Sequence, residues 1–358
     1  MNEYDINDKR EQKEFTGKTF SNYKKGDAKK QLLNSLKNNK IEDACYWSGE
    51  LICAGHFLDL WEYIIEFIGK NINVSNVKLP MYLETRINCF VDILKTHYIG
   101  YELSMRNNKQ IRELFAEIIC VLCQSKKRPK FEKTKISAGE FNMHELKHKL
   151  KAPTTDYAKQ ILQKEDAQEI LIAVNELCYN ISKEVSHFQH ACYWIDWLLE
   201  YERIANKNKQ KLHACRRVFV PIDEKLQMDI IWIVWDCILS ESRKRSQNII
   251  KINSSILSIF CLRFTPATKK KRRYLIYYAL SLLTEPFSIN NPLISNTDEL
   301  SFITQKINFI YKQIKKKEIE PATSYMFSSN GEKTKEDKLK ELNQKLDIYS
   351  NMSYIPRQ

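Results

Sequence analysis

Residues 43–68 carry one continuous apolar stripe, and this stripe constrains the fold more than any other feature of the sequence. Its apolar residues recur alternately every four and every three positions, at Trp47, Leu51, Ala54, Leu58, Trp61, Ile65 and Ile68. This spacing places them on one face of a helix, whereas a strand would need alternation of two. Gly55 interrupts the stripe, and glycine commonly ends a helix. We therefore expect two helices joined by a tight turn at residues 54–56, which bury their stripes against each other and against other elements.

Part of this stretch recurs later in the chain. The Ala-Cys-Tyr-Trp of residues 44–47 returns at residues 191–194, and residues 120–128 resemble residues 237–245, where an apolar helix again ends in basic residues. The two motifs keep the same order in both halves. We expect an all-α protein with two domains of antiparallel helical hairpins, related by a diverged internal duplication. Chance similarity between amphipathic helices is the alternative.

The length and composition agree with this organisation. A chain of 358 residues is long enough for two domains, and only 8 Gly and 9 Pro are typical of an all-α protein. Lys, Arg, Gly and Pro gather in residues 126–154, where we place the boundary. The predicted segments are a disordered basic lead at 1–26, an N-terminal helical domain at 27–125, a linker at 126–154, a C-terminal helical domain at 155–320, and a charged tail with a short amphipathic helix at 321–358.

Other features bear on where the protein works. No apolar run reaches the ~18 residues that a membrane span needs, and the polar N-terminus is unlike a secretory signal. The ten Cys lie mostly within apolar helical runs, as at Cys120, Cys178 and Cys261. Such cysteines are usually buried thiols in a reducing compartment, so we expect an intracellular protein with no membrane partner.

One basic stretch is the strongest functional signal. The formal net charge is +13, and ten Lys or Arg with no Asp or Glu lie between residues 243 and 273. The predicted binding residues bracket an apolar helix; they are Arg243, Lys244, Arg245, Lys251, Lys269, Lys270, Lys271, Arg272 and Arg273. Two basic ends on one side of a hairpin would suit a phosphate backbone or an acidic protein surface. The alternatives are solvated helix ends and a localisation signal at residues 269–273.

A zinc-hydrolase pattern provides a rival hypothesis. His144, Glu145 and His148 form H-E-x-x-H, which on a helix places two imidazoles on one face with the glutamate beside them as a base. Glu165 or Glu169 would be the third ligand. The surrounding segment is polar, and a solvated helix face is the alternative interpretation.

Structural zinc is the other metal hypothesis. Cys120 and Cys123 have C-x-x-C spacing but no second pair at zinc-finger distance, and His187, His190 and Cys192 would have to complete the ligand set. Core packing explains the same spacing. No phosphate-binding glycine loop is present, so we expect neither P-loop nucleotide hydrolysis nor any other cofactor.

Two resemblances carry further expectations. The stretches DACYWSGELICAGHFLDLWE and MDIIWIVWD resemble an uncharacterised helical family of large nucleocytoplasmic, mimivirus-like DNA viruses, which implies a location in the host cytoplasm, nucleus or viral factory. Residues 32–93 also resemble the helical collar of clamp-loader-related ATPases of the RarA/WRNIP type. That resemblance implies a homo-oligomer or a multiprotein complex rather than ATP hydrolysis.

The sequence therefore predicts a non-enzymatic scaffold or adaptor with a basic face, acting in viral DNA transactions. A structural virion component and a zinc-dependent hydrolase using His144, Glu145 and His148 are the alternatives.

Overall fold

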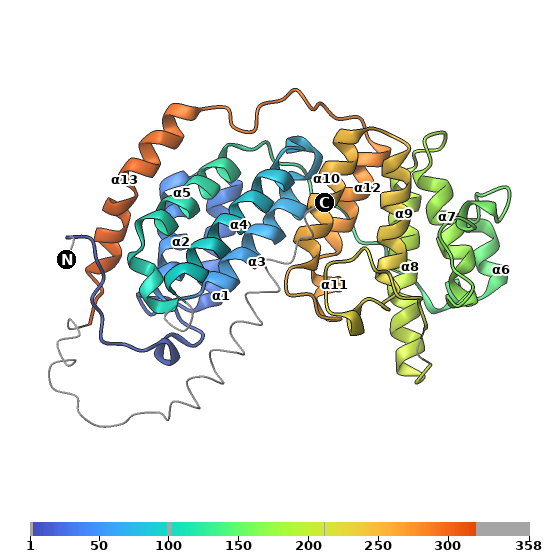
Figure 1. Ribbon diagram of the computed structural model, residues 1–358, viewed down its shortest axis with the longest axis horizontal. Helices are drawn as coiled ribbons and strands as arrows, with labels where there is room; N and C mark the ends of the chain where they lie inside the picture. The colour runs from blue at the N-terminus through green and yellow to red at the C-terminus, as the bar shows by residue number, and fades with distance from the viewer. Residues whose placement is uncertain (1–2, 99–101, 211, 320–358) are drawn as a thin grey trace. The chain divides into compact units, whose positions relative to one another are not determined.

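The described residues form helices and no sheet, which confirms the all-α fold class (Figure 1). The structure is a computed structural model that describes residues 3–98, 102–210 and 212–319. Its α-helices are α1 (Lys25–Lys37), α2 (Ile41–Cys53), α3 (Phe57–Phe67), α4 (Leu79–His97), α5 (Lys109–Gln124), α6 (Met143–Leu146), α7 (Leu171–Ile181), α8 (Phe188–Lys207), α9 (Ile231–Arg243), α10 (Gln247–Cys261), α11 (Thr268–Lys271), α12 (Arg273–Thr284) and α13 (Thr297–Lys315). None of these helices has the length and apolar character that crossing a bilayer requires.

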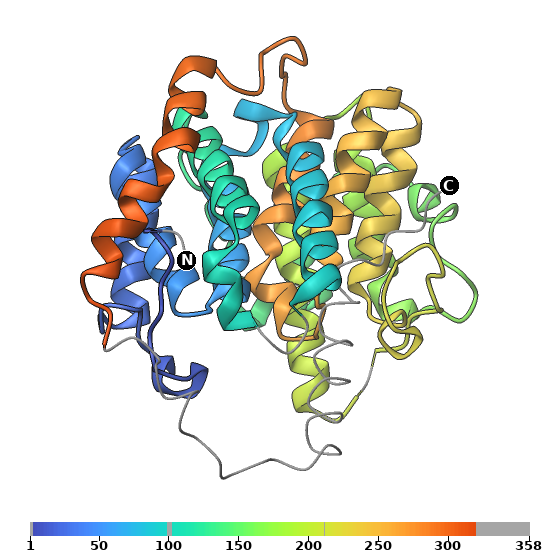
Figure 2. The ribbon, with the colours of Figure 1, turned by 60° about the vertical axis from the view of Figure 1, so that its left-hand side comes forward.

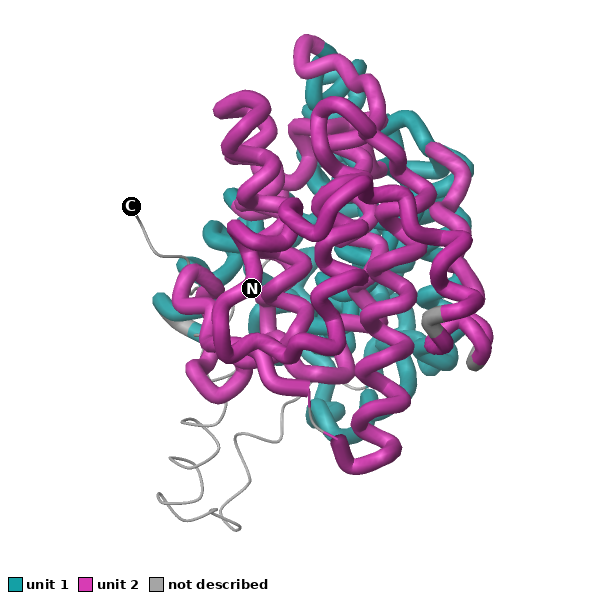
Figure 3. The backbone as a smooth tube through the Cα atoms, turned by 90° about the vertical axis from the view of Figure 1, so that its right-hand side faces the viewer, with its two compact units in different colours: residues 1–72, 85–127, 291–353 teal, residues 73–84, 128–290, 354–358 magenta. Residues whose placement is uncertain are grey.

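The chain divides into two compact units whose parts are not contiguous in sequence (Figure 3). Unit 1 comprises the described residues within 1–72, 85–127 and 291–353, and unit 2 those within 73–84 and 128–290. The chain thus leaves unit 1 at residue 73, returns to it partway along α4, and returns again for α13.

Unit 1 is built around the predicted stripe. Gly55 has a φ of +75°, and the turn that it makes separates α2 from α3 as expected. The ring of Trp61 packs against Phe90 on α4 and Phe115 on α5, with ring centroids 5.7 and 5.1 Å apart. Trp61 is buried, as predicted, whereas Trp47 is only half-buried. The stripe is therefore the core of unit 1 from α2 into α3, and it meets solvent at Trp47 and Leu58.

Unit 2 packs α7 against α8, and α10 against both α9 and α12 (Figure 2). Its largest fully buried side chains include Trp194 on α8, Trp232 and Trp235 on α9, and Tyr277 and Tyr278 on α12. Because Trp194 is the counterpart of the stripe residue Trp47 in the repeated motif, its burial is the result that the repeat predicts. Because large aromatic side chains bury much apolar surface, these three helices make a large contribution to the core of unit 2.

The N-terminal lead differs from the prediction of disorder at residues 1–26. Within the described residues, Phe15 and Phe20 are buried and stack with ring centroids 5.9 Å apart. Ser21 donates both its backbone N–H and its hydroxyl to the buried carboxylate of Glu50, over 2.9 and 2.5 Å. The segment is ordered because two aromatic side chains and a buried acceptor outweigh its polar composition.

The predicted linker and domain ends also differ. Residues 128–154 pack into unit 2, where Arg128 pairs with Glu285 over 2.8 Å and Phe131 packs against Phe188 at 5.0 Å. The predicted domain at 155–320 omits residues 73–84, and it includes α13, which lies in unit 1. The predicted tail, residues 321–358, lies outside the described residues.

Candidate functional site

The structure places the two predicted basic clusters at opposite ends of α10. Residues 243–245 end α9 and lie just before α10 begins, whereas residues 269–273 follow its C-terminus. Arg272 donates to the carbonyl oxygen of Phe260, 2.9 Å away in the last turn of α10. A helix of this length spans about 22 Å. The two clusters therefore do not share one side of a hairpin, which corrects the arrangement that the sequence suggested.

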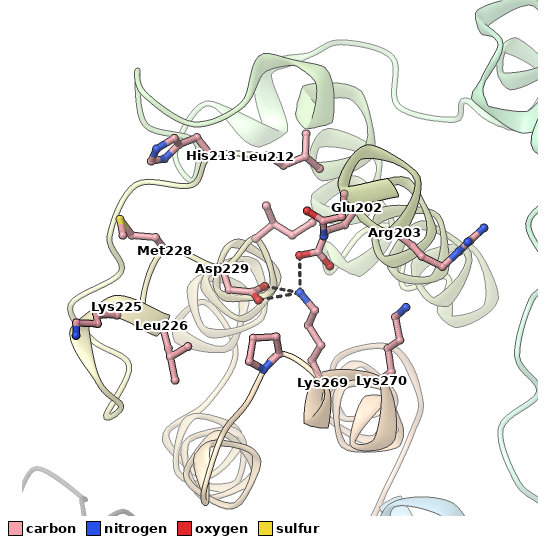
Figure 4. Close-up of a pocket in the computed structure, with 13 residues that line it drawn as sticks. Glu202, Arg203, Leu212, His213, Lys225, Leu226, Met228, Asp229, Lys269 and Lys270 are labelled. Atoms are coloured by element: carbon pink, nitrogen blue, oxygen red, sulfur yellow. Dashed lines mark hydrogen bonds and ion pairs between the residues drawn. The ribbon is translucent and has the colours of Figure 1, made fainter. Parts of the chain in front are cut away.

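Lys269 is a structural residue. It is only 4% exposed, and its Nζ lies 2.5 Å from Glu202 Oε1 and 2.7 Å from Asp229 Oδ2 (Figure 4). Burial raises the pKa of Glu202, and the positive charge of Lys269 opposes that rise. Two carboxylates around one ammonium leave no net positive charge for a phosphate. The exposure assumed for Lys269 is wrong because α8 and the loop before α9 supply partners that are distant in sequence.

Arg272 and Arg273 are also committed to internal contacts. Arg272 is 4% exposed and donates to backbone carbonyl oxygens at the C-terminal end of α10. Arg273 donates to Asp196 Oδ1 over 2.8 Å, and the same oxygen accepts from the Tyr277 hydroxyl at 2.6 Å. Neither guanidinium is free to bind a ligand as predicted, since each satisfies acceptors inside unit 2.

The other predicted residues are divided between the two ends of α10. Arg245 is half-buried and pairs with Glu241 on α9 over 3.0 Å, and Lys244 reaches the same carboxylate at 3.4 Å. Five of the nine remain exposed to solvent; these are Arg243, Lys244, Lys251, Lys270 and Lys271. Of these five, Lys270 and Lys271 lie at the C-terminal end of α10.

A basic pocket lies beside Lys270. It has a volume of about 470 Å³ and is lined by Lys133, Thr134, Lys135, Ile136, Asp196, Leu199, Glu200, Arg203, Lys270 and Arg273. Five of these side chains are cationic and two are carboxylates. Arg203 and Lys270 also line a pocket of about 440 Å³ around the buried Lys269, where they lie on the same side (Figure 4).

Lys133 and Lys135 come from the segment that the sequence suggested to be a linker. The backbone N–H of Thr134 donates to Asp196 Oδ2 over 2.9 Å, which fixes the segment against α8. Successive side chains of an extended segment point to opposite sides, so residues two apart share a side. Lys133 and Lys135 are accordingly both exposed, while Thr134 and Ile136 are half-buried. One buried carboxylate therefore positions both lysines at the pocket.

The pocket has a net positive charge, because its lining holds five cationic side chains and two carboxylates. Lys133, Lys135 and Lys270 make no ion pair with any residue in the part of the chain that the structure describes. Arg203 is different, because it pairs with Glu200 at 2.6 Å. The hydrogen bond from Arg203 lowers the pKa of Glu200, and the charges of Lys133 and Lys270 lower it further. Three ammonium groups thus line one pocket without a direct ion pair, although two of them lie near enough to Glu200 to lower its pKa.

The metal candidates take other positions. His144 lies in the single turn of α6, and His148 lies in the 3-10 turn that follows it, so the H-E-x-x-H segment is not one continuous α-helix. Cys120 and Cys123 are buried in α5, and burial raises the pKa of these thiols to about 11 and about 12. Among the described residues, no group of three or more His, Cys, Asp or Glu is arranged to hold a metal ion.

No protein-family model, curated protein or solved structure matches this chain.

Proposed function

We propose that the protein is a non-enzymatic helical scaffold that binds the phosphate backbone of nucleic acid through the basic pocket of unit 2. The observation that carries this proposal is the convergence of Lys133, Lys135 and Lys270, all exposed and without an ion-pair partner among the described residues, on one opening. A phosphate backbone offers regularly spaced negative charges, and lysine binds them as a point charge. The resemblance to a viral helical family would place such binding in viral DNA transactions.

The proposed binding is largely independent of base sequence. Lysine ammonium groups that contact phosphates release condensed counterions, and this term carries no sequence information. The segment holding Lys133 and Lys135 is fixed by Asp196 rather than free, so these two charges are positioned before any ligand arrives. Preorganised charges lose less conformational entropy on binding than mobile ones.

The test replaces Lys133, Lys135 and Lys270 together with Gln. Log affinity for duplex DNA falls against log salt with a slope of about −0.9 for each phosphate contact. The triple variant should therefore flatten the slope by ~2.7 if each lysine makes one contact. The melting temperature should hardly change, because exposed unpaired charges contribute little to stability. Fluorescence anisotropy across a salt series, with DNA and RNA titrated separately, measures the slope.

The matched control replaces Arg243, Lys244 and Lys251 with Gln. These residues are also exposed cations of unit 2, but they lie at the other end of α10. The control should keep the wild-type slope. An equal effect of both triples would show that the whole basic surface binds rather than this pocket. Absence of any complex with either nucleic acid at low salt, for folded protein, would refute the proposal and favour an acidic protein partner.

A further inference from the structure

Two cysteines of unit 2 lie within contact distance of each other. Cys178 in the middle of α7 and Cys237 in the middle of α9 have their sulfur atoms 3.4 Å apart. Cys178 is half-buried, whereas Cys237 is 1% exposed. A disulfide has an S–S length of about 2.05 Å, so a shift of ~1.4 Å would bring the sulfurs to bonding distance. Cys178 is thus the accessible thiol of the pair, and Cys237 is the enclosed one.

A pocket opens directly onto this pair. Its volume is about 510 Å³, and both sulfur-bearing residues line it. The lining includes two lysines and three acidic residues, so the pocket has no excess of positive charge, and it is the access to the sulfur pair that matters; these residues are Lys183, Lys244, Asp156, Glu184 and Glu241. The cavity is large enough for the end of a tripeptide to reach Cys178 without unfolding the helices.

We propose that Cys178 and Cys237 form a reversible disulfide by exchange with a small disulfide such as glutathione disulfide. Cys178 loses its proton to solvent and its thiolate attacks one sulfur of glutathione disulfide. A mixed disulfide forms and one glutathione leaves as a thiolate, which takes up a proton. Cys237 then gives its proton to solvent and its thiolate attacks Cys178 Sγ, and the second glutathione leaves as a thiolate that takes up a proton. Two protein thiols are oxidised and one glutathione disulfide is reduced to two glutathione molecules.

The order of attack follows from the surroundings of the two sulfurs. Burial raises the pKa of Cys237 well above that of an ordinary thiol, and the neighbouring Cys178 raises it further. A thiol that ionises with difficulty is a poor first nucleophile. Once glutathione is attached to Cys178, the adjacent sulfur of Cys237 is held beside the bond that it must break, which favours the second exchange.

The disulfide would link α7 covalently to α9. The two cysteines are 59 positions apart in sequence. A cross-link between distant residues stabilises mainly by restricting the unfolded chain. Oxidation should therefore raise the melting temperature of unit 2 by roughly 5–10 °C, less any strain from moving the helices together.

The experiment uses full-length protein carrying Cys89→Ala and Cys215→Ala, which removes the other half-buried thiols of the described chain. Folded protein is incubated with glutathione disulfide, and free thiols are alkylated before peptide mapping by mass spectrometry. We expect one intramolecular link between residues 178 and 237, no retained glutathione, and a raised melting temperature that dithiothreitol reverses.

Two further substitutions in the same background separate the steps. Cys237→Ser should trap glutathione on Cys178 as a stable mixed disulfide, with no rise in melting temperature. Cys178→Ser should take up no glutathione and form no link. The proposal is overturned if the folded parent shows no 178–237 link, or if Cys178→Ser reacts as readily as the parent. Circular dichroism confirms that each variant is folded before it is scored.

Discussion

Helices α2 and α8 carry the same Ala-Cys-Tyr-Trp, and in each helix a buried carboxylate holds an extended segment in place. In α2 the carboxylate is Glu50, which accepts from Ser21 of the N-terminal lead. In α8 it is Asp196, which accepts from Thr134 of the segment between α5 and α6. Both segments are polar and basic, and composition alone suggested a disordered lead and a linker. The comparison shows that a buried acceptor on a distant helix, together with aromatic contacts, can order such a segment.

The two carboxylates differ in the number of partners that they accept from. The Asp196 carboxylate also accepts from Arg273 and Tyr277, so it connects α8 to α12 as well as to the segment. Glu50 accepts from Ser21 and forms no ion pair with any residue that the structure describes, so its carboxylate mainly serves the lead. Loss of Asp196 should therefore disturb a whole unit, and loss of Glu50 chiefly one segment.

The largest predicted effect is that of Asp196→Ala. It would leave the Arg273 guanidinium, the Tyr277 hydroxyl and the Thr134 N–H without their acceptor in a buried site. Breaking a buried pair in this way costs about 3–5 kcal/mol. Glu50→Ala should cost less, about 1.5–3 kcal/mol, because it removes hydrogen bonds to a charged acceptor but strands no cation. Urea unfolding followed by circular dichroism gives both values.

Limited trypsin digestion sharpens this prediction by locating the change. Asp196→Ala should expose Lys133 and Lys135 to rapid cleavage, and Glu50→Ala should do the same for Lys18 and Lys24. The control is Asp43→Ala, because Asp43 is an exposed carboxylate of α2 with only a 3.8 Å contact to Lys40. It should cost under about 0.5 kcal/mol and leave the digestion pattern unchanged. Equal effects of the two buried carboxylates on both segments would break the comparison.

The next effect concerns the tryptophans of the shared motif. Trp194 is fully buried in unit 2, whereas Trp47 is half-buried and packs edge-on against Tyr23 at 5.3 Å. Trp194→Ala should cost about 3–5 kcal/mol, the usual range for a large aromatic in a core. Trp47→Ala should cost only about 1–2 kcal/mol, because part of its apolar surface is already in water. Similar losses in urea unfolding would mean that the two positions are equivalent after all.

The duplication hypothesis gains only limited support from these helices. The rings of Tyr46 and Trp47 lie edge-on at 5.4 Å, and those of Tyr193 and Trp194 at 5.1 Å. Adjacent residues of any α-helix project about 100° apart, however, so this likeness does not need common descent. The first copy ends at the Gly55 turn, while α8 continues to Lys207. The shared feature is a helix rather than a hairpin, and the duplication stays a hypothesis.

The helices of the fold were largely predictable because their signals are local. The period of the stripe, the glycine turn and the scarcity of glycine and proline each depend on neighbouring residues. The unit boundaries were not predictable from such signals. Residues 73–84 and α13 join units through contacts with segments more than a hundred positions away, and no local pattern encodes those contacts.

The candidate site was likewise only partly predictable from the sequence. Lys269 and Lys270 are neighbours in one basic run, yet one is enclosed by Glu202 and Asp229 and the other faces solvent. Glu202 and Asp229 lie 67 and 40 positions from Lys269 in the sequence, so the basic run itself cannot distinguish Lys269 from Lys270. The alternation of Lys133 and Lys135 is visible in the sequence, but its meaning depends on the anchor that Asp196 provides. Charge runs therefore indicate a basic unit without identifying its free charges.

The smallest predicted effect is that of removing one hydroxyl from each motif. Tyr193 donates to Glu140 Oε2 over 2.6 Å, and this contact holds the segment that follows Lys135. Tyr193→Phe should cost about 1–2 kcal/mol, since it breaks a hydrogen bond to a charged acceptor. In α2, burial and the nearby charge of Glu50 raise the pKa of Tyr46. Tyr46→Phe should cost at most ~0.5–1 kcal/mol, because the Glu50 carboxylate keeps its Ser21 donors. Hydrogen exchange should then rise at residues 137–142 for Tyr193→Phe and stay unchanged at residues 18–24 for Tyr46→Phe. A rise in the N-terminal lead instead would show that Tyr46, rather than Glu50 alone, holds it in place.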